Sequence, residues 1–159
     1  MVTTAARPQS RGRTSASPSR RRLDVRDPAA QAFLVLWVGF ITAPILFGLD
    51  KFFDVLVDWN VYLAPEINDL VPGNAHQAML AVGVIEIVAG LVVAVKPKFG
   101  GYLVAAWLAG IIVNLLILGE YYDVALRDFG LLIGALALAR LATGFEQRAR
   151  RPVSSASTT

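Results

Sequence analysis

Four long apolar stretches set the strongest constraint on the fold of this chain. They cover residues 30–49, 77–95, 101–119 and 124–142. A helix needs about 20 apolar residues to cross about 30 Å of hydrocarbon, because each residue advances the helix by about 1.5 Å. Each stretch is therefore close to the length of one membrane crossing, and 55% of all residues are hydrophobic. The sequence predicts an all-α protein, an integral membrane four-helix bundle over residues 29–145.

The fourth stretch is the least apolar of the four. Arg127 and Asp128 lie near its start and Arg140 lies near its end, so only residues 129–139 are free of charge. Helix tilt, or an Arg140 side chain that extends to the interface, supplies the missing length.

The basic residues predict the orientation of the bundle. Seven arginines precede the first stretch, Lys96 and Lys98 separate the second and third, and four arginines end or follow the fourth. Basic residues near helix ends are retained in the cytoplasm, whereas the other connections carry mainly acids. We therefore expect a multi-pass protein of a prokaryotic inner membrane, with both termini in the cytoplasm.

The two ends of the sequence differ in composition from the apolar part. Residues 1–28 and 146–159 are rich in Ser, Thr, Ala, Arg and Pro, which predicts disordered cytoplasmic tails. The net charge of +3 does not indicate a nucleic-acid partner, because membrane topology explains where the bases lie. The expected surroundings are a lipid bilayer and another membrane protein.

Several kinds of chemistry lack the residues they need. The chain has no cysteine, so it cannot run a thiol–disulfide relay by itself. His76 is its one histidine, and Met79 lies one turn further along the same stretch, so the pair cannot ligate a haem from opposite faces. No catalytic or zinc motif is present. We assign no catalytic residue and no metal site.

Glu86 lies near the middle of the second stretch, where a membrane-spanning helix rarely carries charge. Its neighbours at helical spacing are Val82, Gly83, Ala89 and Gly90. Small residues allow helices to approach closely, so Glu86 is expected to face the bundle interior. Two interpretations stay open: a carboxyl that binds a ligand or exchanges a proton, or one that hydrogen-bonds to fix helix packing.

Other polar residues are expected to converge with Glu86 at the non-cytoplasmic end of the bundle. Together with Glu86 and Asn114 they would form a polar funnel, and the remaining members are Asp50, Lys51, His76, Glu120, Arg127 and Asp128. Each has a structural alternative. Lys51 and Arg127 could only neutralise nearby acids, His76 could cap a helix, and Asn114 could join two helices.

The connection over residues 50–72 has a pattern of its own. Acidic residues recur at steps of four, at Asp50, Asp54 and Asp58, between apolar residues. This pattern predicts an amphipathic segment that continues the first helix or lies in the membrane interface, with Trp59 and Tyr62 in the aromatic belt. Whether this segment is a lid over the funnel or packs on the membrane surface stays open.

Two short segments carry a family resemblance. Residues 47–52 read FGLDKF and residues 83–90 read GVIEIVAG. They are similar to the G-x-x-K-[FL] and G-x-x-E-[LI]-x-x-G signatures of the DoxX-like family of small four-helix membrane proteins. The resemblance covers about residues 33–142 and carries over five motif residues, which are Gly48, Lys51, Gly83, Glu86 and Gly90. The fourth stretch is short for this family, and the cysteines of some redox-linked relatives are absent.

The resemblance implies a membrane component associated with redox enzymes, in some relatives a subunit of a quinone-reducing oxidoreductase. Our leading hypothesis is a quinone or similar ligand in the bundle, with Glu86 exchanging a proton or accepting a hydrogen bond. Lys51 and Asn114 would orient the polar head of the ligand. A partner would supply electrons, so the chain is not a complete enzyme alone. A scaffold or assembly factor with a structural polar core is the rival, a small transporter is a third class, and a homo-oligomer is compatible with each.

Overall fold

The structure, a computed structural model, describes residues 26–68 and 73–150. All regular elements in these ranges are helical. In chain order they are α1 (Pro28–Asp50), the 3-10 helix η1 (Trp59–Tyr62), α2 (Pro65–Asn68), α3 (Ala75–Val95), α4 (Pro97–Leu118) and α5 (Tyr122–Arg150).

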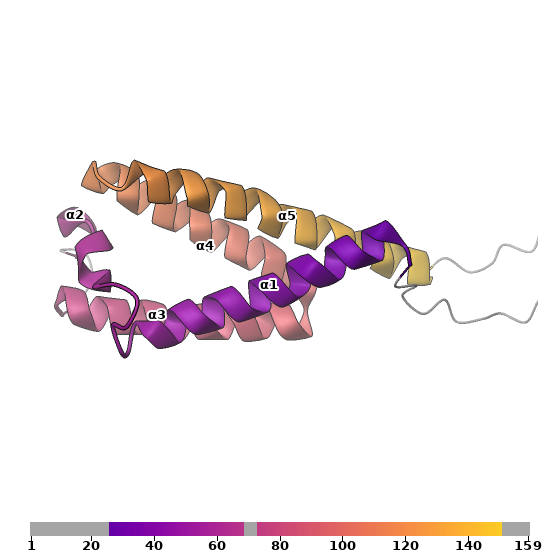
Figure 1. The fold of residues 1–159 in the computed structure, drawn as a ribbon, viewed down its shortest axis with the longest axis horizontal. Coiled ribbons are helices and arrows are strands. Elements are labelled where there is room, and N and C mark those ends of the chain that lie inside the picture. The colour runs from indigo at the N-terminus through magenta and orange to yellow at the C-terminus, as the bar shows by residue number, and fades with distance from the viewer. Residues whose placement is uncertain (1–25, 69–72, 151–159) are drawn as a thin grey trace, which may run out of the picture.

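The four long helices are arranged as two pairs. Figure 1 shows α1 beside α3 and α4 beside α5, with η1 and α2 at the end of the molecule opposite the beginning of α1. The start of α1 and the end of α5 lie at one end, where Arg148 and Asp27 approach to 3.7 Å. The pairs are closer together at that end than at the end that carries η1 and α2.

Three of the long helices, α1, α3 and α4, are long and apolar enough to cross a membrane. They indicate a membrane protein whose exposed apolar side chains contact lipid. The fourth, α5, is 29 residues long but carries Arg127, Asp128 and Arg140 within its length.

Local sequence signals explain where these helices begin and end. The Asp27 side chain accepts a hydrogen bond from the backbone N–H of Ala29 ahead of α1, whose first residue is Pro28. Asn74 and Gln77 form a reciprocal capping box at the start of α3. Gly119 ends α4 with a φ of 74°, a left-handed conformation that glycine adopts without a steric penalty.

The hydrophobic core lies between the two pairs at their closely packed end. It contains aromatic, branched aliphatic and small residues from all four long helices, among them Phe33, Phe40, Val93, Val104, Leu108 and Leu138. On the α4–α5 side, Gly101 packs against α5 so closely that an added Cβ would lie 2.8 Å from the carbonyl oxygen of Ala135. This packing holds the two helix pairs together at the end where α1 begins.

Two expectations about the helices need correction. The helix α5 continues through residues 146–150, for which the composition predicts a disordered tail. Residues 51–58 do not form an amphipathic helix, because the chain turns at Asp54 with a φ of 49° and η1 begins only at Trp59. The tails at 1–25 and 151–159, and residues 69–72, lie outside the described residues.

Candidate functional site: a cleft around Lys51 and Glu86

Two glycines bring α1 and α3 into backbone contact. A Cβ added at Gly48 would lie 2.6 Å from the carbonyl oxygen of Gly83, and a Cβ added at Gly83 would lie 2.7 Å from the carbonyl oxygen of Gly48. Side chains larger than hydrogen do not fit at such distances, so both positions require glycine. The next functional residue in each motif follows three positions later, at Lys51 and Glu86.

This close approach produces a buried ion pair. Lys51 Nζ donates to Glu86 Oε2 at 2.8 Å, and the two side chains are only 3% and 10% exposed. The Lys51 ammonium also lies 3.6 Å from the ring centroid of Trp59, a distance typical of a cation–π contact. Each charge therefore has a partner, which a charge removed from water requires.

Asp50 organises the chain that follows α1. Its carboxylate accepts from the backbone N–H groups of Val55 and Leu56, and from Trp59 Nε1 at 2.7 Å. These bonds satisfy donors in a nonhelical segment whose side chains are largely exposed and apolar. Asp50 thereby places the Trp59 ring over Lys51.

Asn114 attaches the same connection to α4. Its Oδ1 accepts from the backbone N–H of Ala64 at 3.0 Å, and its Nδ2 donates to the carbonyl oxygen of Tyr62 at 2.6 Å. Residues 56–67 therefore form one wall of a cavity between the helix pairs, to which they contribute Leu56, Val57, Trp59, Tyr62, Leu63 and Ile67. We call residues 56–67 the cover, because they close one side of this cavity.

Replacing Asn114 by alanine should loosen this cover. The Ala64 N–H and the Tyr62 carbonyl would lose their hydrogen-bond partners. Ala64 is fully buried, and a buried polar group without a partner lowers the free energy of unfolding by about 1–3 kcal/mol. Hydrogen–deuterium exchange of the amides in residues 59–68 should become faster, while exchange within α4 stays slow. Asn60→Ala is the control, because the Asn60 side chain donates to Asp58 in its own turn. Equal exchange in both variants would contradict the assignment.

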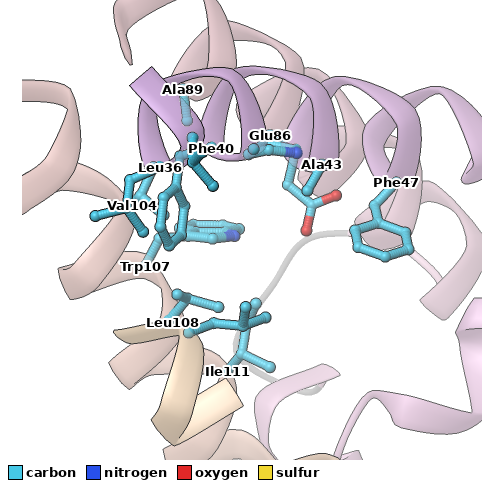
Figure 2. Close-up of a pocket in the computed structure, with 14 residues that line it drawn as sticks. Leu36, Phe40, Ala43, Phe47, Glu86, Ala89, Val104, Trp107, Leu108 and Ile111 are labelled. Carbon is cyan, nitrogen blue, oxygen red and sulfur yellow. The ribbon is translucent and has the colours of Figure 1, made fainter. Parts of the chain in front are cut away.

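Two cavities meet beside Glu86. The first, about 440 Å³, is lined by the cover and by polar groups that include Lys51, Glu86, Asn114, Arg127 and Asp128. The second, about 330 Å³, is apolar except for Glu86 and Trp107 and lies between α1 and α4 (Figure 2). They share the lining residues Phe47, Glu86, Trp107, Leu108, Ile111 and Leu131. We call the two together the cleft.

Trp107 differs from the other two tryptophans. Trp37 Nε1 donates to the Val93 carbonyl and Trp59 Nε1 donates to Asp50, whereas Trp107 Nε1 is buried and makes no hydrogen bond of normal geometry to the described residues. In Figure 2 the indole nitrogen and the Glu86 carboxylate face the same open space. A buried N–H without a partner costs about 1–3 kcal/mol, and the acceptor that this N–H faces is the Glu86 carboxylate.

A second acid and base lie across the cleft from Lys51. Arg127 Nε donates to Asp128 Oδ1 at 3.2 Å. The Asp128 side chain is 6% exposed, whereas that of Arg127 is 60% exposed and reaches outward. Each base of the cleft is thus paired with an acid.

The structure brings together only part of the predicted funnel. Lys51, Glu86, Asn114 and Arg127 line the cleft, and so does Asp128. Asp50 lies beside it as the organiser of the cover. His76 and Glu120 are exposed and line neither cavity, so their placement in the funnel needs correction.

His76 and Glu120 lie away from the cleft for a local reason. His76 follows the Asn74 cap and points outward from the first turn of α3. Glu120 lies in the tight turn between α4 and α5, next to Gly119. Both lie at the same end of the molecule as the cleft, but neither side chain lines it.

The sequence interpretation missed Trp107 and the contact of Trp59 with Lys51. The sequence predicts Trp59 in the aromatic belt of the membrane interface, and the structure shows in addition that its ring lies over the Lys51 ammonium. A signal for Trp107 was present, since tryptophan is enriched at the ends of membrane-spanning helices and Trp107 lies in the middle of the third apolar stretch.

Comparisons with known proteins add no further assignment: no family model, no curated protein and no solved structure matches this chain. The function must be argued from the cleft.

Proposed function

We propose that this protein binds a quinone, or a similar lipid-soluble redox ligand, in the cleft around Glu86. It would serve as the membrane subunit or partner of a redox system in a prokaryotic inner membrane. The observation that supports the proposal is the junction of the two cavities, where Glu86, bonded to Lys51, and the Trp107 indole lie at the end of an apolar chamber. An apolar cavity with a few convergent polar groups is the usual form of a small-ligand site.

The proposed membrane arrangement has four crossings and cytoplasmic termini. It is supported by the three apolar helices and by α5, whose Arg127 and Arg140 side chains are exposed and long enough to extend to the interfaces. The connection between α3 and α4 lies at the same end as the start of α1 and the end of α5, since Lys98 approaches Glu146 to 3.4 Å and Arg148 approaches Asp27 to 3.7 Å. The basic residues there favour the cytoplasm.

The proposed chemistry is limited to binding, orientation and proton exchange. Glu86 would accept a hydrogen bond or a proton from the reduced ligand, and Lys51 would hold the carboxylate in place. Asn114 would act through the cover that it attaches and not as a direct ligand, because both ends of its amide are already bonded. Electrons would come from a partner protein, so the chain is not a complete enzyme by itself.

The resemblance to the DoxX-like family is consistent with this role but rests on the two motifs alone. The geometry gives those motifs a physical meaning, since Gly48 and Gly83 allow the approach that pairs Lys51 with Glu86. Gly90 packs in the same way further along the helix, where an added Cβ would lie 3.0 Å from the Ile41 carbonyl oxygen.

Co-purification of quinone with the protein tests the proposal. Wild-type protein in mild detergent or in nanodiscs should yield about one quinone per chain on solvent extraction and mass spectrometry. Because a single substitution at the ion pair leaves a buried charge, the comparison is the double variant Lys51→Met/Glu86→Gln, which removes both charges. It should remain folded and lose the quinone. Quinone-free wild-type protein in native lipids would contradict the proposal.

A scaffold or assembly factor is the second candidate. Glu86 is already paired with Lys51, as a structural carboxylate would be. Small residues also lie on outer faces, since Gly130 is exposed and a Cβ added there would have no neighbour within 4 Å. This candidate predicts that Gly130→Leu abolishes binding of a partner protein, whereas the redox proposal predicts an unchanged quinone content.

A further inference from the structure

We infer that residues 52–55, which we call the tip, insert into the hydrocarbon of the bilayer leaflet farther from the start of α1, and that Asp50 makes this insertion possible by pairing backbone N–H groups of the tip. Three features of the tip lead to this inference: its depth beside α3, its exposed apolar side chains and its paired backbone. None of them involves a ligand in the cleft, so the tip and the proposed function are tested separately.

The tip begins beside the first half of α3 and not beyond the end of that helix. A Cβ added at Gly83 would lie 3.1 Å from Lys51 Cβ and 3.1 Å from the Phe52 ring, so the start of the tip is level with Gly83. Figure 1 shows the chain after α1 turning before it reaches the end of the molecule that carries α2. Gln77 is the last polar residue of α3 before Gly83 and precedes it by six residues, or about 9 Å along the helix. With Gln77 at the membrane boundary, the tip begins about 9 Å inside the hydrocarbon.

The side chains of the tip suit contact with hydrocarbon. Phe53 and Val55 are 71% and 78% exposed, and they follow Leu46 and Leu49, which are exposed on the last turns of α1. The apolar surface of α1 that faces lipid therefore continues into the tip. Asp54 is the one charged residue of the tip and limits its depth, because a carboxylate is costly at the bilayer centre. Interfacial segments bury their apolar side chains about 5–10 Å deep, which agrees with the level of Gly83.

The backbone of the tip is prepared for a medium without water. Nonhelical segments rarely face lipid, because their N–H groups find no acceptor there. The first three N–H groups of the tip donate to the carbonyl oxygens of Leu49 and Asp50 at 2.7–3.0 Å, and the fourth, of Val55, donates to the Asp50 carboxylate at 3.2 Å. Unpaired carbonyls are tolerated more often than unpaired N–H groups, so the donors are the stricter requirement. Asp50 pairs three of the four donors, a service that water would provide to an ordinary surface loop.

The chain has no cysteine, so a single introduced cysteine can be labelled with a nitroxide without removing native thiols. Phe53→Cys and Val55→Cys place the label in the tip, where the high exposure of both side chains leaves the core unchanged. His76→Cys is the control, because His76 is exposed at the same end of the molecule but precedes Gln77. Electron paramagnetic resonance of the protein in nanodiscs compares collisions of each label with oxygen, which concentrates in hydrocarbon, and with a water-soluble nickel chelate.

Both labels in the tip should collide more often with oxygen than with the nickel chelate, at a depth of about 5–10 Å, whereas the label at residue 76 should show the reverse preference. Asp50→Ala removes the side-chain acceptor of the Val55 N–H and should move the label at residue 53 towards water. Asp50→Asn keeps one side-chain oxygen as an acceptor and should preserve the depth of that label.

A preference for the nickel chelate at both positions in the tip would overturn the inference by placing the tip in water. Few collisions with either reagent, together with an immobilised label, would overturn it by showing that protein, such as a second copy of the chain, covers the tip. An unchanged depth in Asp50→Ala would overturn the role of Asp50. Quinone-free protein whose labels lie at the expected depth would contradict the proposed function and support this inference.

Discussion

Replacing Lys51 by methionine is expected to lower the free energy of unfolding by about 3–5 kcal/mol, because it leaves the Glu86 carboxylate buried without its cation. Glu86→Gln should have a similar effect by leaving the ammonium of Lys51 unpaired. The double variant should be much more stable than the sum of the two losses predicts, since it leaves no buried charge uncompensated. Thermal unfolding in one detergent, followed by circular dichroism, would measure all three.

A second ion pair in the same protein provides the control. Lys98 and Glu146 lie 3.4 Å apart with nearly half of each side chain exposed. Removing an exposed pair changes stability by less than about 1 kcal/mol, so Lys98→Met should unfold close to the wild-type temperature. If the effects of Lys51→Met and Glu86→Gln were additive, the two side chains would not be coupled and the site as described would be incorrect.

Replacing Gly83 by alanine should lower the free energy of unfolding by about 1–3 kcal/mol, the usual cost of overpacking. The added methyl would lie 2.7 Å from the carbonyl oxygen of Gly48, so α1 and α3 must move apart. Because Lys51 follows Gly48 by one turn, the same movement should weaken its bond to Glu86. The loss of stability should therefore be smaller when Gly83→Ala is made in the Lys51→Met/Glu86→Gln background.

Gly130→Ala should change stability in the opposite direction. Gly130 is helical like Gly83, but an added Cβ has no neighbour within 4 Å. Alanine is favoured over glycine in a helix by about 0.5–1 kcal/mol, so this variant should equal or exceed wild-type stability. Similar losses in both alanine variants would indicate that the close approach at Gly83 has no special role.

The sequence predicts that Glu86 is buried but does not predict that Lys51 is its partner. The position of Glu86 between Gly83 and Gly90 indicated an interior carboxyl, and it is buried. The motif did not indicate that Lys51 would bond directly to it, because this depends on where α1 ends relative to α3. Asp50 is the last residue of α1, so Lys51 begins the turn beside the middle of α3, where Glu86 lies.

The spacing of the acids after α1 predicts a helix that the structure does not form over residues 51–58. Acids at steps of four indicate a helix, yet the Asp50 carboxylate accepts hydrogen bonds from the backbone N–H groups of Val55 and Leu56 ahead of η1 and from the Trp59 side chain. A carboxylate that bonds to several backbone N–H groups after a helix competes with continuation of that helix. The spacing of acids in the sequence does not reveal whether the carboxylate or the helix takes those donors.

The sequence by itself determined the helices, because a run of about 20 apolar residues has few other stable structures in a membrane and its caps are local signals. It also determined that Glu86 faces protein, because small neighbours at helical spacing form a packing face. Only the tertiary structure decided which polar groups meet. The offset of α1 against α3 brings Lys51 to Glu86 beneath the Trp59 ring, and Trp107 lines the same cleft, whereas His76 and Glu120 do not. These relations join residues far apart in the chain, and the geometry of helix packing sets them.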